Sequence, residues 1–190
     1  MFWIQLSFLF FVQGAQIIKR SFLVRFIKPI FWISVIIPFL NSALLSHWQY
    51  GVWKNGPLAD FLLPPHRSIV YFIEYSAWKF WVPVFFALVF ALIFILVSKF
   101  LNKKNQEKFL EREEPYLFGI GIVLAGCPVF LVYILAFFLL FLVVNIFETV
   151  KNKSSYRASP YYLWLPAALV AIIISELWLS HMPWWRLLII

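Results

Sequence analysis

The sequence predicts an all-α, multi-pass integral membrane protein. Of its 190 residues, 64% are apolar and only 13% are charged, and the mean hydropathy is +0.88. An average soluble domain is about half apolar and about a quarter charged, and it needs those charges to cover its surface. The composition therefore excludes a soluble enzyme, a disordered tail and a disulfide scaffold. We expect a single transmembrane domain over residues 1–190, with about four spanning helices and a further helix at the N-terminus.

The first apolar run, residues 2–18, predicts either an amphipathic helix in the membrane interface or a fifth spanning helix. It is short for a hydrocarbon core that is ~30 Å thick. One side of the helix carries a polar stripe, formed by Gln5, Gln13, Gln16 and Arg20. Such a stripe suits either the headgroup layer or a partner helix, so residues 1–28 are treated as interfacial or spanning. Because basic residues follow this run instead of preceding it, we expect no cleavable signal peptide.

Two spanning helices are predicted at residues 29–46 and 80–98. Pro29 suits the first position of a helix, where its missing N–H costs nothing. Pro38 predicts a kink, and Asn41 is the one strongly polar residue of the first span. The second span is uncharged and is the clearest of the set.

Residues 47–79, between these spans, predict an aromatic loop on the membrane surface. Glycine and proline residues interrupt regular structure there. The tryptophans and tyrosines among them favour the headgroup layer. Residues 68–78 suit a short interfacial helix.

The apolar segment 116–148 is too long for one upright crossing. About 30 apolar residues extend roughly 45 Å as a helix, against a core of ~30 Å. Residues 126–128 interrupt the run as Gly-Cys-Pro. Either the segment crosses the membrane once as a tilted and kinked helix, or the residues before the interruption form a short helix that enters the membrane and turns back, and the residues after it form the crossing. Length favours the single crossing, which is the topology we expect; the last spanning helix is predicted at 161–180.

The 16 lysines and arginines outnumber the 8 acidic residues and lie mainly beside the apolar runs. There they set orientation and meet anionic headgroups. If 116–148 crosses the membrane once, 10 of these 16 residues lie on the cytoplasmic side. If the segment enters the membrane and returns to the same side, 12 of them do. Both topologies predict that 19–28 and 99–112 are cytoplasmic, in a bacterial inner membrane or an equivalent energy-transducing or organellar membrane. No basic patch with interleaved aromatic residues lies in a soluble segment, so we expect no nucleic-acid partner.

No catalytic motif is complete in this chain. Glu113-Glu114 matches the start of the EExxxR pattern of intramembrane prenyl-protein proteases, but Phe118 occupies the arginine position, which excludes the match. Cys127 is the only cysteine, so the sequence predicts neither an intramolecular disulfide nor a thiolate metal cluster. We expect no catalytic and no metal site, and the sequence does not indicate a cofactor.

Polar residues at membrane depth are the candidates for function. They are Glu176 in the last span, Glu148 at the end of the span before it, and Asn41. Proton or ion handling requires them to converge on a polar cavity; otherwise the carboxylates reach the headgroups and the asparagine bonds across helices. The remaining candidates are His47, His66 and His181. The three histidines lie on the same, outer side of the membrane only if 116–148 enters the membrane and returns to the side it came from. No two of them have the helical spacing of metal ligands.

The preferred functional hypothesis is a non-catalytic integral membrane subunit, or an assembly or scaffold component, of a larger membrane complex. The chain has 41 aromatic residues and few reactive groups. So much aromatic surface suits packing against partner helices, lipids or bound pigments. The expected partners are the lipid bilayer and either other membrane subunits or further copies of the chain.

Two alternatives remain open. One is a small oligomeric transporter or channel that uses Glu176, Glu148 and Asn41, with a proline providing the helix break that such sites often use. The other is a lipid-modifying enzyme with its reactive residues in the 47–79 loop. Those residues would be Asp60, His66 and Arg67.

Overall fold

The computed structural model describes residues 2–56, 59–105, 110–152 and 160–186, and within these ranges the chain is helical and has no strand. The helices are α1 (Phe2–Ile18), α2 (Arg20–Asn55), α3 (Ile69–Ser76), α4 (Val82–Lys104), α5 (Glu114–Ala125), α6 (Val129–Asn152), α7 (Trp164–Leu177) and α8 (Pro183–Arg186). Short turns lie between them: η1 (Asp60–Leu62), the π turn η2 (Ala77–Trp81), η3 (Pro160–Tyr162) and η4 (Leu179–His181).

Four helical stretches are long and apolar enough to cross a membrane. They are Arg20–Asn55, Ile69–Lys104, Val129–Lys151 and Pro160–His181. Helices satisfy their own backbone hydrogen bonds, as the hydrocarbon core requires. The predicted fold class, an all-α multi-pass membrane protein with a further apolar helix at the N-terminus, is confirmed.

α5 is the centre of the bundle. It contacts α2, α4, α6 and α7, and every residue from Glu114 to Leu124 is buried. A helix that is apolar on all sides has no face to expose, so it packs in the interior. Pro115 lies in its first turn, where a missing N–H is tolerated.

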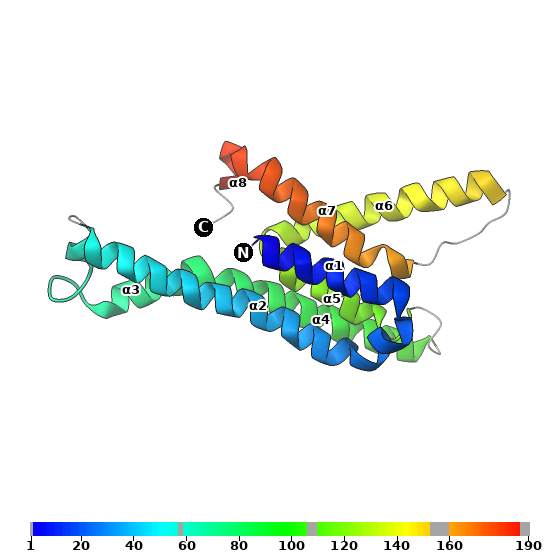
Figure 1. Cartoon of the computed structure of the whole chain (residues 1–190), viewed down its shortest axis with the longest axis horizontal. Helices are drawn as coiled ribbons and strands as arrows, with labels where there is room; N and C mark the ends of the chain where they lie inside the picture. The colour runs from blue at the N-terminus through cyan, green and yellow to red at the C-terminus, as the bar shows by residue number, and fades with distance from the viewer. Residues whose placement is uncertain (1, 57–58, 106–109, 153–159, 187–190) are drawn as a thin grey trace.

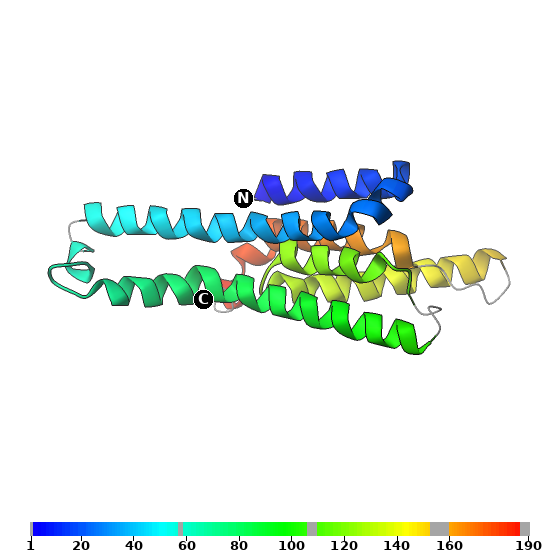
Figure 2. The same cartoon turned by 90° about the horizontal axis from the view of Figure 1, so that it is seen from below.

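The expected single crossing by residues 116–148 is wrong, because the chain reverses between α5 and α6 (Figures 1 and 2). Gly126 has φ +71°, a conformation that favours glycine, and the Cys127–Pro128 peptide is cis. After the turn α6 runs back along α5: Tyr133 packs on Gly121, and both Phe118 and Phe137 contact the ring of Trp164.

The segment 47–79, expected as an aromatic surface loop, is instead helical at its start, where α2 continues to Asn55, while α3 matches the short helix expected at 68–78. α2 begins at Arg20, passes through Pro29 and Pro38, and continues to Asn55. On the return, α3, η2 and α4 form one helical rod from Ile69 to Lys104. Trp53 at the end of α2 packs on Phe72 and Tyr75 of the rod, so these aromatic side chains hold a helical hairpin together.

α1 runs alongside α2, parallel to the bundle axis, and also contacts α7 (Figure 2). Leu6, Leu9, Val12 and Gln16 are its buried residues. Its orientation is that of the crossing helices and differs from that of a helix lying in the interface. Because Gln16 is buried, the polar stripe of α1 faces other helices of this chain at that point.

Candidate functional site

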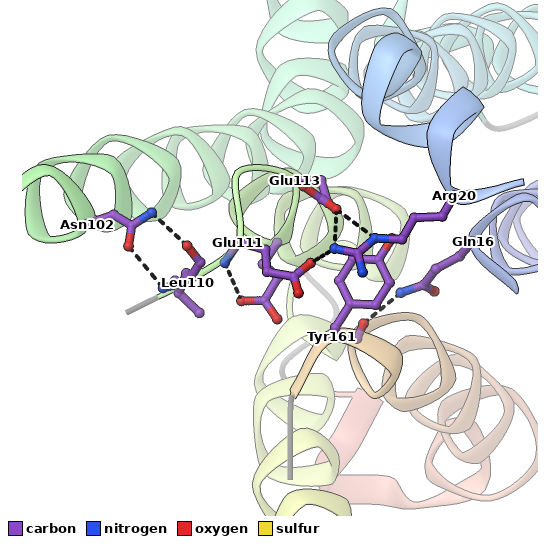
Figure 3. A network of polar contacts seen from close by, with 8 residues as sticks. Gln16, Arg20, Asn102, Leu110, Glu111, Glu113 and Tyr161 are labelled. Atoms are coloured by element: carbon purple, nitrogen blue, oxygen red, sulfur yellow. Dashed lines mark hydrogen bonds and ion pairs between the residues drawn. The ribbon is translucent and has the colours of Figure 1, made fainter. Parts of the chain in front are cut away.

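A polar junction closes the end of the bundle where α1 ends and α2, α5 and α7 begin (Figure 3). The Arg20 guanidinium donates to Glu113 Oε1 from Nε (3.3 Å) and Nη2 (3.1 Å), and it also pairs with Glu111. Its carbon centre lies 4.5 Å from the centroid of the Tyr161 ring, which adds a cation–π contact. One side chain thus links α2 to the residues directly before α5 and to η3, which leads into α7.

Amide side chains extend the junction on both sides. Gln16 Nε2 donates to the backbone oxygen of Tyr161 at 2.6 Å. On α4, Asn102 receives the N–H of Leu110 at 3.0 Å and donates to the oxygen of Leu110 at 2.7 Å. These bonds position the segment that leads into α5. The junction therefore connects α1, α2, α4, α5 and α7.

Glu114 is buried beneath this junction and lies outside the four spanning stretches. Its Oε2 accepts the N–H of Glu111 at 3.1 Å. Its Oε1 is buried without a hydrogen bond of normal geometry, although the Trp164 indole lies nearby. Burial is the main cause that raises the pKa of Glu114 to about 7, and the neighbouring Glu111 and Glu113 add to it. Burial likewise raises the pKa of Glu111, against the opposing charge of Arg20.

Sequence reasoning missed this junction. It considered Glu113-Glu114 only as an incomplete protease motif, and Arg20 only as part of a basic cluster. The arginine that meets Glu113 lies 93 residues earlier in the chain, on another helix. The one available signal was a pair of adjacent carboxyl groups directly before an apolar helix, since such groups need a partner when buried.

A second polar region lies at the α5–α6 turn, where two predicted residues meet. Asn41 and Glu176 line the same pocket of about 440 Å³. An adjoining pocket of about 530 Å³ shares Asn41 and Cys127 with it and is lined mainly by apolar side chains of α2, η2 and α4. We call the first of these the turn pocket. It is lined by Phe2, Gln5, Asn41, Ala125, Cys127, Pro128, Val129, Ile172, Ser175 and Glu176.

Glu148 does not join them. It lies near the far end of α6, while α6 meets the turn pocket at Val129, its first residue. About 19 residues of helix, roughly 28 Å, separate the two positions. Of the three predicted membrane-depth residues, the structure therefore brings together Asn41 and Glu176 only.

The three histidines lie apart. His47 is on α2 beside Trp48, the His66 ring packs 4.8 Å from that of Phe61, and His181 Nδ1 lies 3.1 Å from Ser180 Oγ. Among the described residues, no three His, Cys, Asp or Glu side chains are grouped closely enough to hold a metal ion. Arg67, predicted to act with His66, instead lies over the Tyr71 ring at 4.1 Å.

These features define a helical membrane protein with a buried half-length helix, a charged junction at one end and a polar pocket at the helical turn. No protein-family model, curated protein or solved structure matches the chain. Function is therefore inferred from its own residues.

Proposed function

We propose that this protein is a non-catalytic subunit, or an assembly or scaffold component, of a larger membrane protein complex. The observation that supports this proposal is the last part of α6. Phe137 is its last buried residue, and Leu140 is the last that packs against the core. The following residues, 141–152, are here called the α6 extension. They form a helix about 18 Å long, which runs past the end of α1 and the start of α7 (Figure 1).

The α6 extension has one apolar face. At 100° per residue its exposed apolar side chains fall within an arc of about 140°. Asn145 and Glu148 lie on the opposite side of the helix. The exposed apolar residues are Leu142, Val143, Ile146, Phe147 and Val150.

This face supports a partner because of where it lies. The extension starts near the level of the polar junction, since Phe137 stacks on Trp164 at the start of α7 (3.8 Å between centroids). Most of the extension belongs to Val129–Lys151, a stretch that can cross a membrane, so its exposed apolar face can meet lipid or a helix of another subunit. Rows spaced i, i+4 pack into the groove of another helix, so the occupant we propose is an apolar helix of another membrane subunit.

Site-specific photo-crosslinking in native membranes tests the proposal. A photoreactive phenylalanine analogue at Phe147 should yield an adduct with another membrane protein. The same analogue at Glu148, one residue further on the polar face, should yield none. Phe147→Ser combined with Ile146→Asn should release the partner during purification in mild detergent.

Three outcomes would go against this assignment. Equal adducts from both positions would indicate contact without a specific face. An adduct between two copies of the chain would identify a homo-oligomer in place of a different subunit. A homogeneous monomer in native mass analysis, with no adduct at Phe147, would remove the proposal.

The orientation belongs to the same proposal. The ends of α1 and α4 and the start of α2 lie at the end of the bundle that holds the polar junction, and they carry many of the basic residues, among them Lys19, Arg25, Lys103 and Lys104. Basic residues favour the cytoplasmic side. We therefore assign this end to the cytoplasm of a bacterial inner membrane or an equivalent energy-transducing or organellar membrane.

A second candidate function, a small oligomeric transporter or channel, is favoured by the turn pocket. Asn41 and Glu176 share it, and it lies where a short helix ends inside the bundle, a site that transporters use. Glu148 has no place in such a path. In proteoliposomes, Glu176→Gln should abolish flux while Glu148→Gln leaves it unchanged, and equal flux in both variants would reject this function.

A further inference from the structure

The turn pocket combines a polar side with an apolar side. Its four oxygen-bearing side chains come from three helices, namely Gln5 on α1, Asn41 on α2, and Ser175 and Glu176 on α7. Apolar side chains, among them Phe2, Val129 and Ile172, complete the lining. About half of the lining surface is polar, so the pocket offers both polar and apolar contacts to a ligand.

The charge of the lining is negative. Within the described part of the chain, Glu176 is its one carboxylate, and neither lysine nor arginine lines it. Among the described residues, no basic side chain lies within salt-bridge distance of Glu176. Glu176 is an exposed residue, so its carboxylate is accessible to a ligand and would attract a cation more strongly than a neutral molecule.

The size and donor set favour an organic cation over a metal ion. A volume of about 440 Å³ falls within the range of pockets for small molecules. A divalent metal ion would require several carboxylate or imidazole ligands, and no such group is found among the described residues. The Phe2 ring adds a face on which a substituted ammonium can rest.

The adjoining pocket supplies room for an apolar substituent. It shares Asn41 and Cys127 with the turn pocket and continues past Phe80 and Phe86. Its one basic lining residue is Lys79, whose Nζ donates to the Tyr75 hydroxyl at 2.9 Å. Lys79 keeps its positive charge in this bond, so the adjoining pocket disfavours the charged end of a cation, which is then directed towards Glu176 in the turn pocket.

We infer that the turn pocket is a binding site for a small amphipathic organic cation, an amine or quaternary ammonium whose charge pairs with Glu176 and whose apolar part enters the adjoining pocket. The inference uses the pocket of the second candidate function but requires binding only. A cation that binds without crossing the membrane would reject transport and leave this site in place.

Titration of the purified full chain in detergent tests the site. Benzyltrimethylammonium is the probe, and benzyl alcohol is the neutral comparison. The wild type should bind the cation at least tenfold more tightly than the alcohol. Glu176→Gln should lose that preference, and the matched control Glu148→Gln should keep it, because Glu148 lies far along α6. Each variant should elute as the wild type does on size exclusion.

Cys127 gives a local readout. It lines both pockets and is the only cysteine in the chain, so maleimide labelling reports on this site alone. Benzyltrimethylammonium should slow labelling in the wild type severalfold and should have no effect in Glu176→Gln. Equal affinity for cation and alcohol, an unchanged preference in Glu176→Gln, or labelling that the cation does not slow would each overturn the inference.

Discussion

At the scale of single residues, the structure is defined by polar and small side chains buried at helix contacts. Glu114 and Tyr133 are both buried, and each has an oxygen without a hydrogen bond of normal geometry among the described residues. A buried carboxyl group favours its neutral form. A buried ring beside a glycine leaves no room for a larger residue.

Glu114 makes stability depend on pH. Its pKa in the folded protein is about 7 against an ordinary 4.5, so between these values the folded state binds more protons than the unfolded state. The contribution of Glu114 to stability is therefore greatest below about pH 4.5, decreases as the pH rises, and levels off above about 7. The difference corresponds to about 3 kcal/mol.

Thermal unfolding in detergent from pH 4.5 to 8 measures this dependence. Glu114→Gln should flatten it, leaving the smaller contribution of Glu111, whose pKa is raised in the same direction. Glu74→Gln, on α3 at the other end of the molecule, should leave the profile unchanged. An identical pH profile for Glu114→Gln and wild type would contradict the assignment.

Gly121 is required by its contact with Tyr133. A Cβ atom there would lie 2.6 Å from Tyr133 Cζ and 2.7 Å from its hydroxyl oxygen. We expect Gly121→Ala to lower stability by about 1–3 kcal/mol, because overpacking forces the helices apart. Gly14→Ala, which meets no heavy atom within 4 Å, should be neutral or stabilising by up to about 1 kcal/mol. In a Tyr133→Leu background, Gly121→Ala should lower stability by less. An equal loss of stability in both backgrounds would show that Tyr133 is not what the added Cβ atom meets.

At the scale of elements, α5 is held by its neighbours and could not stand alone. Twelve residues are too few for a stable isolated helix. Packing on four helices compensates for its length, and the polar junction fixes its first turn. The Glu113 side chain is 5% exposed and that of Arg20 is 48% exposed, so loss of Arg20 leaves a buried carboxylate, whereas loss of Glu113 leaves a half-exposed guanidinium.

Arg20→Met should therefore lower stability by about 1–2 kcal/mol, because it leaves a buried carboxylate without its partner. In a Glu113→Gln background the same substitution should cost less, and a double-mutant cycle gives the coupling. Arg25→Met is the control, since Arg25 is exposed and rests over Phe26 of its own helix. Additive effects of the two junction variants would show that the pair contributes nothing.

At the scale of the whole molecule, the α5–α6 turn decides which segments share a side of the membrane. Because the chain reverses direction between α5 and α6, the last residues of α6 lie at the same end of the bundle as the last residues of α4. The tip of the α2–α3 hairpin lies at the opposite end (Figure 1). A single crossing by 116–148 would instead have placed α6 and α4 ends on opposite sides.

Cysteine accessibility in sealed vesicles distinguishes these topologies. In a Cys127→Ser background, single cysteines replacing Lys103 and Lys151 should react with a membrane-impermeant maleimide from the same side. A cysteine replacing His66 should react from the other side. Labelling of positions 103 and 151 from opposite sides would contradict the return.

The sequence predicted part of the candidate sites and missed the rest for one reason. Asn41 and Glu176 were identified because a polar residue in an apolar run is visible in the sequence by itself. Asn41 and Glu176 share the turn pocket with Gln5, and Glu148 lies far from it. This arrangement depends on how helices distant in the sequence pack against one another. The Arg20–Glu113 pair was missed because nothing near either residue indicates the other.

The sequence by itself determined that this protein is helical and crosses the membrane. Transfer into hydrocarbon depends on composition, and the hydrocarbon core admits only helices where apolar runs of this kind occur. Only the tertiary structure decided that α5 returns, that α2 and α3 form a hairpin, and that one face of α6 stays uncovered. These outcomes depend on side chains far apart in the chain meeting at close range, as Gly121 meets Tyr133, and the apolar character of a segment does not specify which other segment it will meet.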